Sequence, residues 1–132
     1  MILKGSCLCG TVRYEIRGPL LGASHCHCSM CRKAHGAAFG SYARVAARDF
    51  RYLQGEDAVV QYQSSAGVTH TFCGTCGATL QWLADARLEV VTITLGTLDD
   101  DPGIRPDRHI FVADKAPWFE IHDALPQHAQ DG

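Results

Sequence analysis

The stretch Phe72-Cys73-Gly74-Thr75-Cys76-Gly77-Ala78-Thr79-Leu80 has the form of a zinc knuckle. Two cysteines with two residues between them can direct both thiolates at one metal ion, and glycine permits the tight turn that this arrangement needs. Phe72 on one side and residues 78–80 on the other predict the strands of a supporting hairpin. A redox dithiol of the thioredoxin type is disfavoured, because no βαβ pattern surrounds the motif.

The other five cysteines lie in two further groups, so the seven cysteines of the chain form three clusters. The two groups are Cys7-Leu8-Cys9 and Cys26-His27-Cys28-Ser29-Met30-Cys31. An odd count argues against a complete disulfide framework. A closed zinc site takes four thiolates, which leaves three, and three protein ligands with a vacant fourth position are typical of a zinc that binds substrate. The sequence therefore predicts one structural and one working metal.

Spacing alone leaves the division of the cysteines between two sites open. The Cys7/Cys9 pair supplies two ligands, and the Cys73/Cys76 pair is its natural partner in a closed site that would stabilise the fold. The three cysteines of the 26–31 cluster would then share the second metal. In a rival division, Cys26 and Cys28 join the Cys73/Cys76 pair.

Histidines give a third possibility, because His25 or His27 could complete a site of three cysteines and one histidine. An orienting or structural role is favoured over ligation for both, although either could also shuttle a proton. Arg32 and Lys33 follow Cys31, and they either meet a substrate carboxylate or form a solvated basic pair. The two tryptophans are expected in the core or in a pocket wall, at Trp82 and Trp118.

Length and composition indicate one small domain. The chain has 132 residues, of which 46% are hydrophobic, and a net charge of −2. No basic stripe is visible, so binding to nucleic acid or to an acidic membrane is disfavoured. No apolar run approaches the roughly 18 residues of a transmembrane helix, and the N-terminus lacks the pattern of a signal peptide. A cytoplasmic location, where thiolate ligands survive, is therefore expected.

The pattern of apolar residues predicts a mainly β domain over residues 1–126 and a loose tail over residues 127–132. The only expected helix is short and covers Ser29 to His35. Runs with strand-like alternation or β-branched residues are Thr11–Arg17, Phe39–Val45, Val59–Gln63, Val68–Phe72, Thr79–Leu83, Leu88–Leu95 and His109–Val112.

Four blocks of the sequence, in this order and at these spacings, resemble the signature of the glutathione-dependent formaldehyde-activating enzyme family. The likeness extends from about Gly5 to Leu125, nearly the whole chain. The blocks are Gly5–Gly10, His25–Lys33, Phe72–Gly77 and His109–Ile121.

The resemblance implies a β-tent, a fold of twisted antiparallel sheets with zinc-binding loops and at most one or two short helices. It also implies two zinc ions per chain. A structural zinc would be held by Cys7, Cys9, Cys73 and Cys76. A second, catalytic zinc would be held by Cys26, Cys28 and Cys31, with its remaining position facing the ligand.

The activity that the resemblance implies is the condensation of formaldehyde with glutathione to S-hydroxymethylglutathione, formally the reverse of a carbon–sulfur lyase reaction. We therefore expect a zinc-dependent carbon–sulfur lyase-like protein that acts on a small-molecule thiol adduct. The alternative is a non-catalytic zinc-binding module that binds a thiol metabolite or a partner protein.

Overall fold

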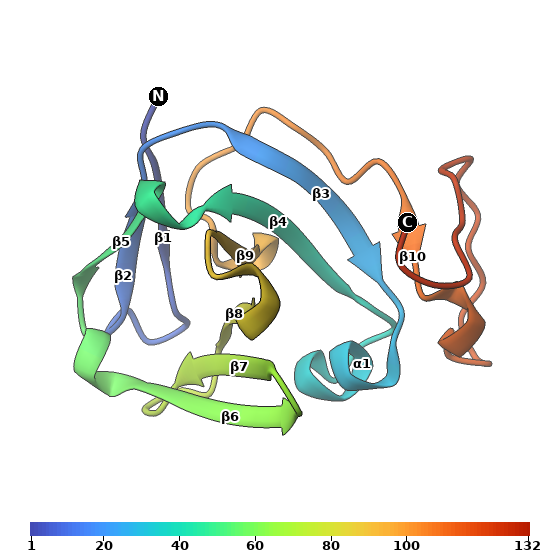
Figure 1. The fold of residues 1–132 in the computed structure, drawn as a ribbon, viewed down its shortest axis with the longest axis horizontal. Helices are drawn as coiled ribbons and strands as arrows, with labels where there is room; N and C mark the ends of the chain where they lie inside the picture. The colour runs from blue at the N-terminus through green and yellow to red at the C-terminus, as the bar shows by residue number, and fades with distance from the viewer.

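The computed structural model describes residues 1–132 and contains ten β-strands in two sheets and a single α-helix (Figure 1). The smaller sheet has the order β1-β2-β5 and consists of β1 (Leu3–Ser6), β2 (Arg13–Ile16) and β5 (Phe50–Gln54). The larger sheet has the order β10-β3-β4-β9-β8-β7-β6. Its strands are β3 (Leu20–Cys26), β4 (Gly40–Ala46), β6 (Val59–Ser65), β7 (Val68–Cys73), β8 (Thr79–Ala84), β9 (Val90–Thr94) and β10 (His109–Ile110).

The mainly β class predicted from the sequence is confirmed. Helix α1 (Ser29–His35) covers the residues that the sequence indicated, and the predicted hairpin is the antiparallel pair β7–β8, with Phe72 opposite Thr79. The remaining helical segments are single 3-10 turns. They are η1 (Ala47–Asp49), η2 (Glu56–Ala58), η3 (Asp85–Arg87), η4 (Leu95–Thr97) and η5 (Val112–Asp114).

The main hydrophobic core lies between the two sheets. It joins residues of β1 and β2 to one face of the central strands β3, β4 and β9. Alternate residues of a strand point to opposite faces, so Ala43 and Val45 of β4 face this core while Tyr42 and Arg44 face the other side. The buried core residues are Leu3, Tyr14, Ile16, Ala23, Ala43, Val45 and Ile93.

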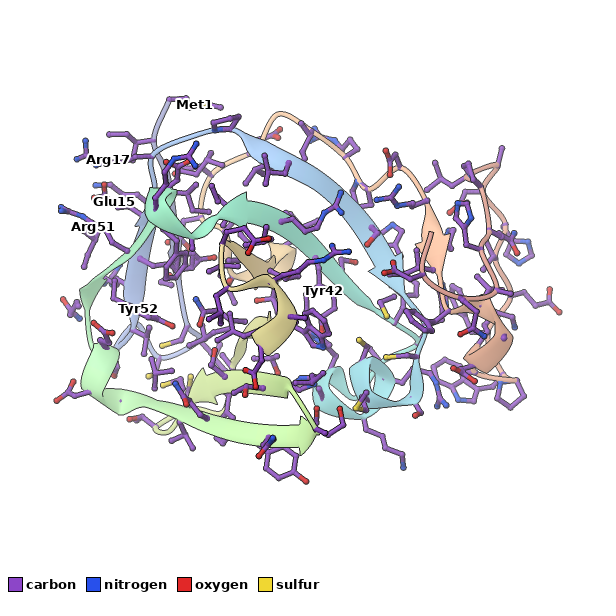
Figure 2. The ribbon with its side chains drawn as sticks, in the orientation of Figure 1. Met1, Glu15, Arg17, Tyr42, Arg51 and Tyr52 are labelled. Carbon is purple, nitrogen blue, oxygen red and sulfur yellow. The ribbon has the colours of Figure 1, made fainter.

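A buried acid on the small sheet is neutralised locally. The side chain of Glu15 is 5% exposed and forms ion pairs with Arg17 and, at 3.8 Å, with Arg51. Figure 2 shows the three side chains together on the outer side of the small sheet, at the left of the view. A buried carboxylate needs such partners, because an unpaired charge in a low-dielectric environment is strongly destabilising. The cluster is therefore part of the fold and lies away from the cysteines.

The C-terminal residues, for which the sequence predicts a loose tail, are attached to the larger sheet by backbone hydrogen bonds. The amide of Phe111 donates to Gln130 O at 3.0 Å, and the amide of His128 donates to His109 O at 2.9 Å. These bonds fold the tail back beside β10. The boundary at residue 126 between a domain and a tail stays a prediction.

Membrane insertion through a helix has no support in the structure. The α-helix has seven residues, and none of the helical segments has the length and hydrophobicity of a membrane span.

Candidate metal centres

Two loops from distant parts of the chain bring four cysteines together. Cys7 and Cys9 follow β1, Cys73 ends β7, and Cys76 lies before β8, and their sulfur atoms are all within 4.8 Å of one another. The sulfur of Cys9 lies 3.6 Å from that of Cys7 and 3.9 Å from that of Cys73. Tetrahedral zinc–sulfur bonds of about 2.3 Å place ligand sulfurs roughly 3.8 Å apart. This four-cysteine cluster therefore has the donor set and spacing of a closed zinc site.

The two loops of the four-cysteine cluster have the same local design. The amide of Gly10 donates to Cys7 O at 3.1 Å, and the amide of Gly77 donates to Cys73 O at 2.7 Å. Both glycines have a φ of 81°, a conformation that other residues rarely adopt. A glycine after the second cysteine thus closes each turn and leaves both sulfurs on one side.

Two cysteines of the four-cysteine cluster have a lowered pKa, whereas burial raises the pKa of Cys7. A backbone hydrogen bond from Ala78 is the main cause that lowers the pKa of Cys76 to about 6, and the Thr11 side chain lowers that of Cys9. Thiolates are the metal-binding form of cysteine. The buried pair Cys7 and Cys73 packs with two aliphatic residues to form the small core of this end of the molecule, completed by Val12 and Leu80.

The second group, the three-cysteine cluster, lies where β3 meets helix α1. Cys26 ends β3, Cys28 caps the helix, and Cys31 is in its first turn. Their sulfurs are within 4.8 Å of one another, and neither His25 nor His27 belongs to the group. The structure thus divides the seven cysteines into one group of four and one group of three. The rival division, in which Cys26 and Cys28 join the Cys73/Cys76 pair, does not occur.

The start of helix α1 favours a thiolate at Cys28. The sulfur of Cys28 accepts a hydrogen bond from the amide of Cys31 at 3.3 Å. Hydrogen bonds from the thiols of Cys26 and Cys31, with further ones from backbone amides, lower the pKa of Cys28. Three sulfur ligands, one of them with a lowered pKa, fit a zinc ion with a fourth position open to a ligand.

A cavity of about 360 Å³ opens on the three-cysteine cluster. All three cysteines line it, together with mostly apolar side chains of the large sheet, among them Trp82 and Ile110. No cavity residue belongs to the four-cysteine cluster. The three-cysteine cluster is therefore the one that opens on a cavity large enough to hold a small molecule.

Tyr42 is the polar side chain next to these cysteines. It is buried and packs with Cys26 and Cys31, and its hydroxyl lies 2.8 Å from Nε2 of His35. Burial and the neighbouring Cys31 raise the pKa of the Tyr42 phenol. Figure 2 shows the Tyr42 side chain in the interior, below β4. Tyr42 is thus a neutral hydroxyl at the cavity wall.

The two histidines beside Cys26 point away from the cavity. Nδ1 of His25 lies 2.8 Å from the hydroxyl of Ser41, and Nε2 of His27 lies 2.8 Å from Nδ1 of His109. His109 in turn contacts the carboxylate of Asp123 at 3.0 Å. The histidines therefore connect the C-terminal segment to the segment that carries Cys26 and Cys28. This agrees with the structural role that the sequence favoured for them.

Other predicted site residues have mixed outcomes. Trp82 lines the cavity as expected, but Trp118 is 69% exposed, so its placement in a core or pocket wall was wrong. Arg32 and Lys33 do not line the cavity. The basic residues that do line it were not identified from the sequence and are Arg44, Arg87 and Arg108.

Comparison with known proteins identifies relatives of the whole chain. Residues 2–114 match the family model described as "Glutathione-dependent formaldehyde-activating enzyme". A Halomonas elongata protein named "Putative glutathione-dependent formaldehyde-activating enzyme" is 35% identical in an alignment of 132 positions, gaps included, that covers 92% of this chain and 82% of that protein. A crystal structure of a Rhodobacter sphaeroides protein superposes with a TM-score of 0.63 at 29% identity, covering 78% of this chain and 91% of that one.

Proposed function

Since the chain belongs to the glutathione-dependent formaldehyde-activating enzyme family, we propose that it is a zinc-dependent, carbon–sulfur lyase-like enzyme that acts on the adduct of a thiol and an aldehyde. The observation that carries the proposal is the three-cysteine cluster in the floor of a cavity, while the other four cysteines form a closed group elsewhere. In this proposal Cys7, Cys9, Cys73 and Cys76 hold a structural zinc. Cys26, Cys28 and Cys31 hold the second one.

The reaction needs no redox partner. The thiol sulfur forms a bond to the aldehyde carbon, the carbonyl π electrons move to oxygen, and the thiol proton ends on that oxygen as a hydroxyl group. Zinc in the three-cysteine cluster would supply Lewis acidity and would lower the pKa of a thiol bound beside it. The free thiols that both sites need also suit the cytoplasm.

The residues of the chain contribute position and shielding. The apolar cavity walls, with Trp82 and Ile110, exclude water from the reacting atoms. The Tyr42 hydroxyl stands beside Cys31 and is held by His35, so it can hydrogen-bond the oxygen that gains the proton. Proximity of the two reactants in a cavity of this size is itself a rate factor.

The test is exchange NMR of formaldehyde and glutathione with the zinc-loaded protein. We expect formation of S-hydroxymethylglutathione above the spontaneous rate, and loss of this excess in Cys31→Ser. The internal control is the metal content of the variant, which should keep the zinc of the four-cysteine cluster and a native circular dichroism spectrum. A wild-type content of one zinc, with Cys26, Cys28 and Cys31 free to react with a thiol reagent, would refute the proposal.

A non-catalytic module that binds a thiol metabolite would give a different result in the same experiment. Such a module would broaden or shift the glutathione signals without accelerating exchange. Resonances of Tyr42 and Trp82 would report binding in either case, because both line the cavity.

A further inference from the structure

Three arginines share the cavity of the three-cysteine cluster with a single acidic residue. Arg44, Arg87 and Arg108 line it, and Asp131 is the only carboxylate among the lining residues. The chain as a whole has a net charge of −2. A net positive cavity in an acidic protein favours an anionic ligand.

The positions of two arginines follow from strand alternation. Gly22 and Cys26 line the cavity from β3, and Arg44 of β4 lies opposite Gly22 in the sheet register. Arg108 lies beside Ser24, because the His25 amide donates to Arg108 O at 3.0 Å and β10 continues in parallel register with β3. Arg44 and Arg108 therefore flank β3 on the same face as Cys26.

Arg108 carries a hydrogen-bond donor without a partner. Its Nε is buried and makes no hydrogen bond, and the carboxylate of Asp107 is 3.9 Å away. An unsatisfied buried donor of a charged group is destabilising by more than a neutral one. The Arg108 side chain as a whole is 27% exposed and lines the cavity, so a ligand carboxylate there can form a charge-assisted hydrogen bond with its guanidinium.

Arg44 lies over β3 because Gly22 has no side chain. A Cβ atom at Gly22 would come within 2.6 Å of Nη2 of Arg44. The guanidinium of Arg44 makes no ion pair with any carboxylate of the chain and adjoins the cavity. Gly22 thus leaves room for the unpaired guanidinium of Arg44 on this face of β3.

The two arginines lie at different register positions along β3 relative to Cys26. With a rise of about 3.3 Å per residue, Ser24 and Gly22 lie roughly 7 and 13 Å along β3 from Cys26. Two anionic groups of a ligand would therefore have to be attached at unequal reach from its thiol.

We propose that Arg44 and Arg108 form a clamp for two carboxylates of a peptide-like thiol whose sulfur is at the three-cysteine cluster. The clamp rests on the proposed function, since it presumes that a thiol binds there. Free cysteine, with its carboxylate close to the sulfur, cannot reach both arginines. A thiol without a carboxylate forms an ion pair with neither arginine. Arg87 is exposed at the rim and adds attraction at longer range.

The experiment is calorimetric titration of the zinc-loaded protein with glutathione, its glycine monoethyl ester, γ-glutamylcysteine and the neutral thiol mercaptoethanol. We expect glutathione to bind most tightly, and its Kd to rise about tenfold in Arg44→Gln and in Arg108→Gln, as for a lost charge-assisted hydrogen bond. Mercaptoethanol should bind equally to wild type and both variants. Arg48→Gln is the matched control, because the Arg48 side chain is 85% exposed and outside the cavity.

A thermodynamic cycle assigns each carboxylate. Suppose that one of the two arginines binds the glycine carboxylate of glutathione. The glutamine variant of that arginine has already lost this contact, so its affinity should not fall further when the carboxylate is esterified or absent. The variant of the other arginine still makes the contact, so its affinity should fall. Glutathione and mercaptoethanol binding equally, or glutathione binding unchanged by either substitution, would overturn the clamp and leave the proposed function standing. Failure of every thiol, mercaptoethanol included, to bind would overturn both. The ester comparison on wild type keeps the test valid even if a variant misfolds.

Discussion

The four-cysteine and three-cysteine clusters use the same ligand type in opposite surroundings. In the four-cysteine cluster Cys9 is exposed, and only a small hydrophobic core with Val12 and Leu80 surrounds the buried sulfurs. In the three-cysteine cluster Cys26 and Cys31 are buried, yet a cavity leads to them. The site near the surface has all four ligands, and the deeper one has a position left for a small molecule.

This contrast shows that the solvent exposure of a metal site does not by itself determine whether its metal can react. A metal close to solvent is inert when its ligand set is complete, while a deeper metal is reactive when one ligand is missing and a cavity supplies a path. The four-cysteine cluster joins β1 to the β7–β8 hairpin, so a metal bound there would contribute to folding.

The largest expected effect is on stability and concerns Cys73. Cys73→Ser removes a fully buried ligand of the four-cysteine cluster and should lower the free energy of unfolding by several kcal/mol. Because small domains have only about 5–15 kcal/mol in total, much of the protein should be unfolded near room temperature. The measurement is thermal denaturation followed by circular dichroism.

The matched variant is Cys31→Ser, which is equally a buried cysteine but belongs to the three-cysteine cluster. It should lower stability by only about 1–2 kcal/mol, the usual range for a buried substitution that leaves the fold intact. Equal losses in the two variants would mean that both metals support the fold, and the division of roles would fail.

Zinc release should also divide the two clusters. With a chelator in excess, we expect one zinc per chain to leave about tenfold faster than the other, because one site has a ligand fewer. Release is followed with a colorimetric zinc indicator, and Cys31→Ser should abolish the fast phase alone. Exposure alone would predict the reverse order, so loss of the fast phase in Cys76→Ser instead would contradict the coordination argument.

Two tyrosines offer a finer comparison. The hydroxyl of Tyr42 bonds to His35 beside the three-cysteine cluster, and that of Tyr52 donates to Gln81 at 3.0 Å beside the four-cysteine cluster. Each Tyr→Phe change should cost about 1 kcal/mol of stability, the usual net value of one hydrogen bond. Only Tyr42→Phe should also lower kcat, by about tenfold.

Steady-state kinetics with zinc-replete variants measure this difference. A fall in kcat with an unchanged KM would place the Tyr42 hydroxyl at the transition state, whereas a rise in KM alone would limit it to binding. Equal kcat values for Tyr42→Phe and Tyr52→Phe would remove Tyr42 from the reaction.

Sequence patterns predicted the strands whose residues alternate or are β-branched, and they missed the others. The alternation in the run Phe39–Val45 and the β-branched run Leu88–Leu95 correspond to β4 and β9. Strand β3 was missed because Leu20-Leu21-Gly22-Ala23-Ser24-His25-Cys26 contains no β-branched residue and has a glycine inside it. Its strand character comes from pairing on both sides with β4 and β10, which local sequence does not report.

Part of the candidate site was missed for a similar reason, because local sequence does not report strand pairing. The cysteines were visible because their clustering is local. The cavity arginines come from separate segments, namely β4, the 3-10 turn η3 and the residue before β10, and their meeting at one cavity depends on strand register. Arg44 and Tyr42 are two residues apart in the predicted strand Phe39–Val45 and so lie on the same face. This spacing was the one indication in the sequence that Arg44 could share a cavity with Tyr42. Arg32 and Lys33 drew attention by adjacency to Cys31, yet the turn of helix α1 carries them away from the cavity.

The smallest expected effect is a difference in acid stability beside the three-cysteine cluster. Burial, with a further contribution from the nearby His70, lowers the pKa of His35. The unfolded state therefore binds more protons than the folded state below the unfolded pKa of about 6.5. The contribution of His35 to stability is present above that pH and is lost as the pH falls towards the folded pKa.

In His35→Gln this acid-dependent loss should disappear, while the glutamine amide can still bond to the Tyr42 hydroxyl. Urea denaturation of zinc-loaded protein at several values between about pH 7.5 and pH 5.5 measures it. His122→Gln is the control, because the side chain of His122 is 82% exposed. Zinc release in acid affects all three proteins alike, so the difference between their curves isolates His35. Parallel curves for wild type and His35→Gln would show that the imidazole binds protons equally in both states, and burial beside the three-cysteine cluster would then not control its charge.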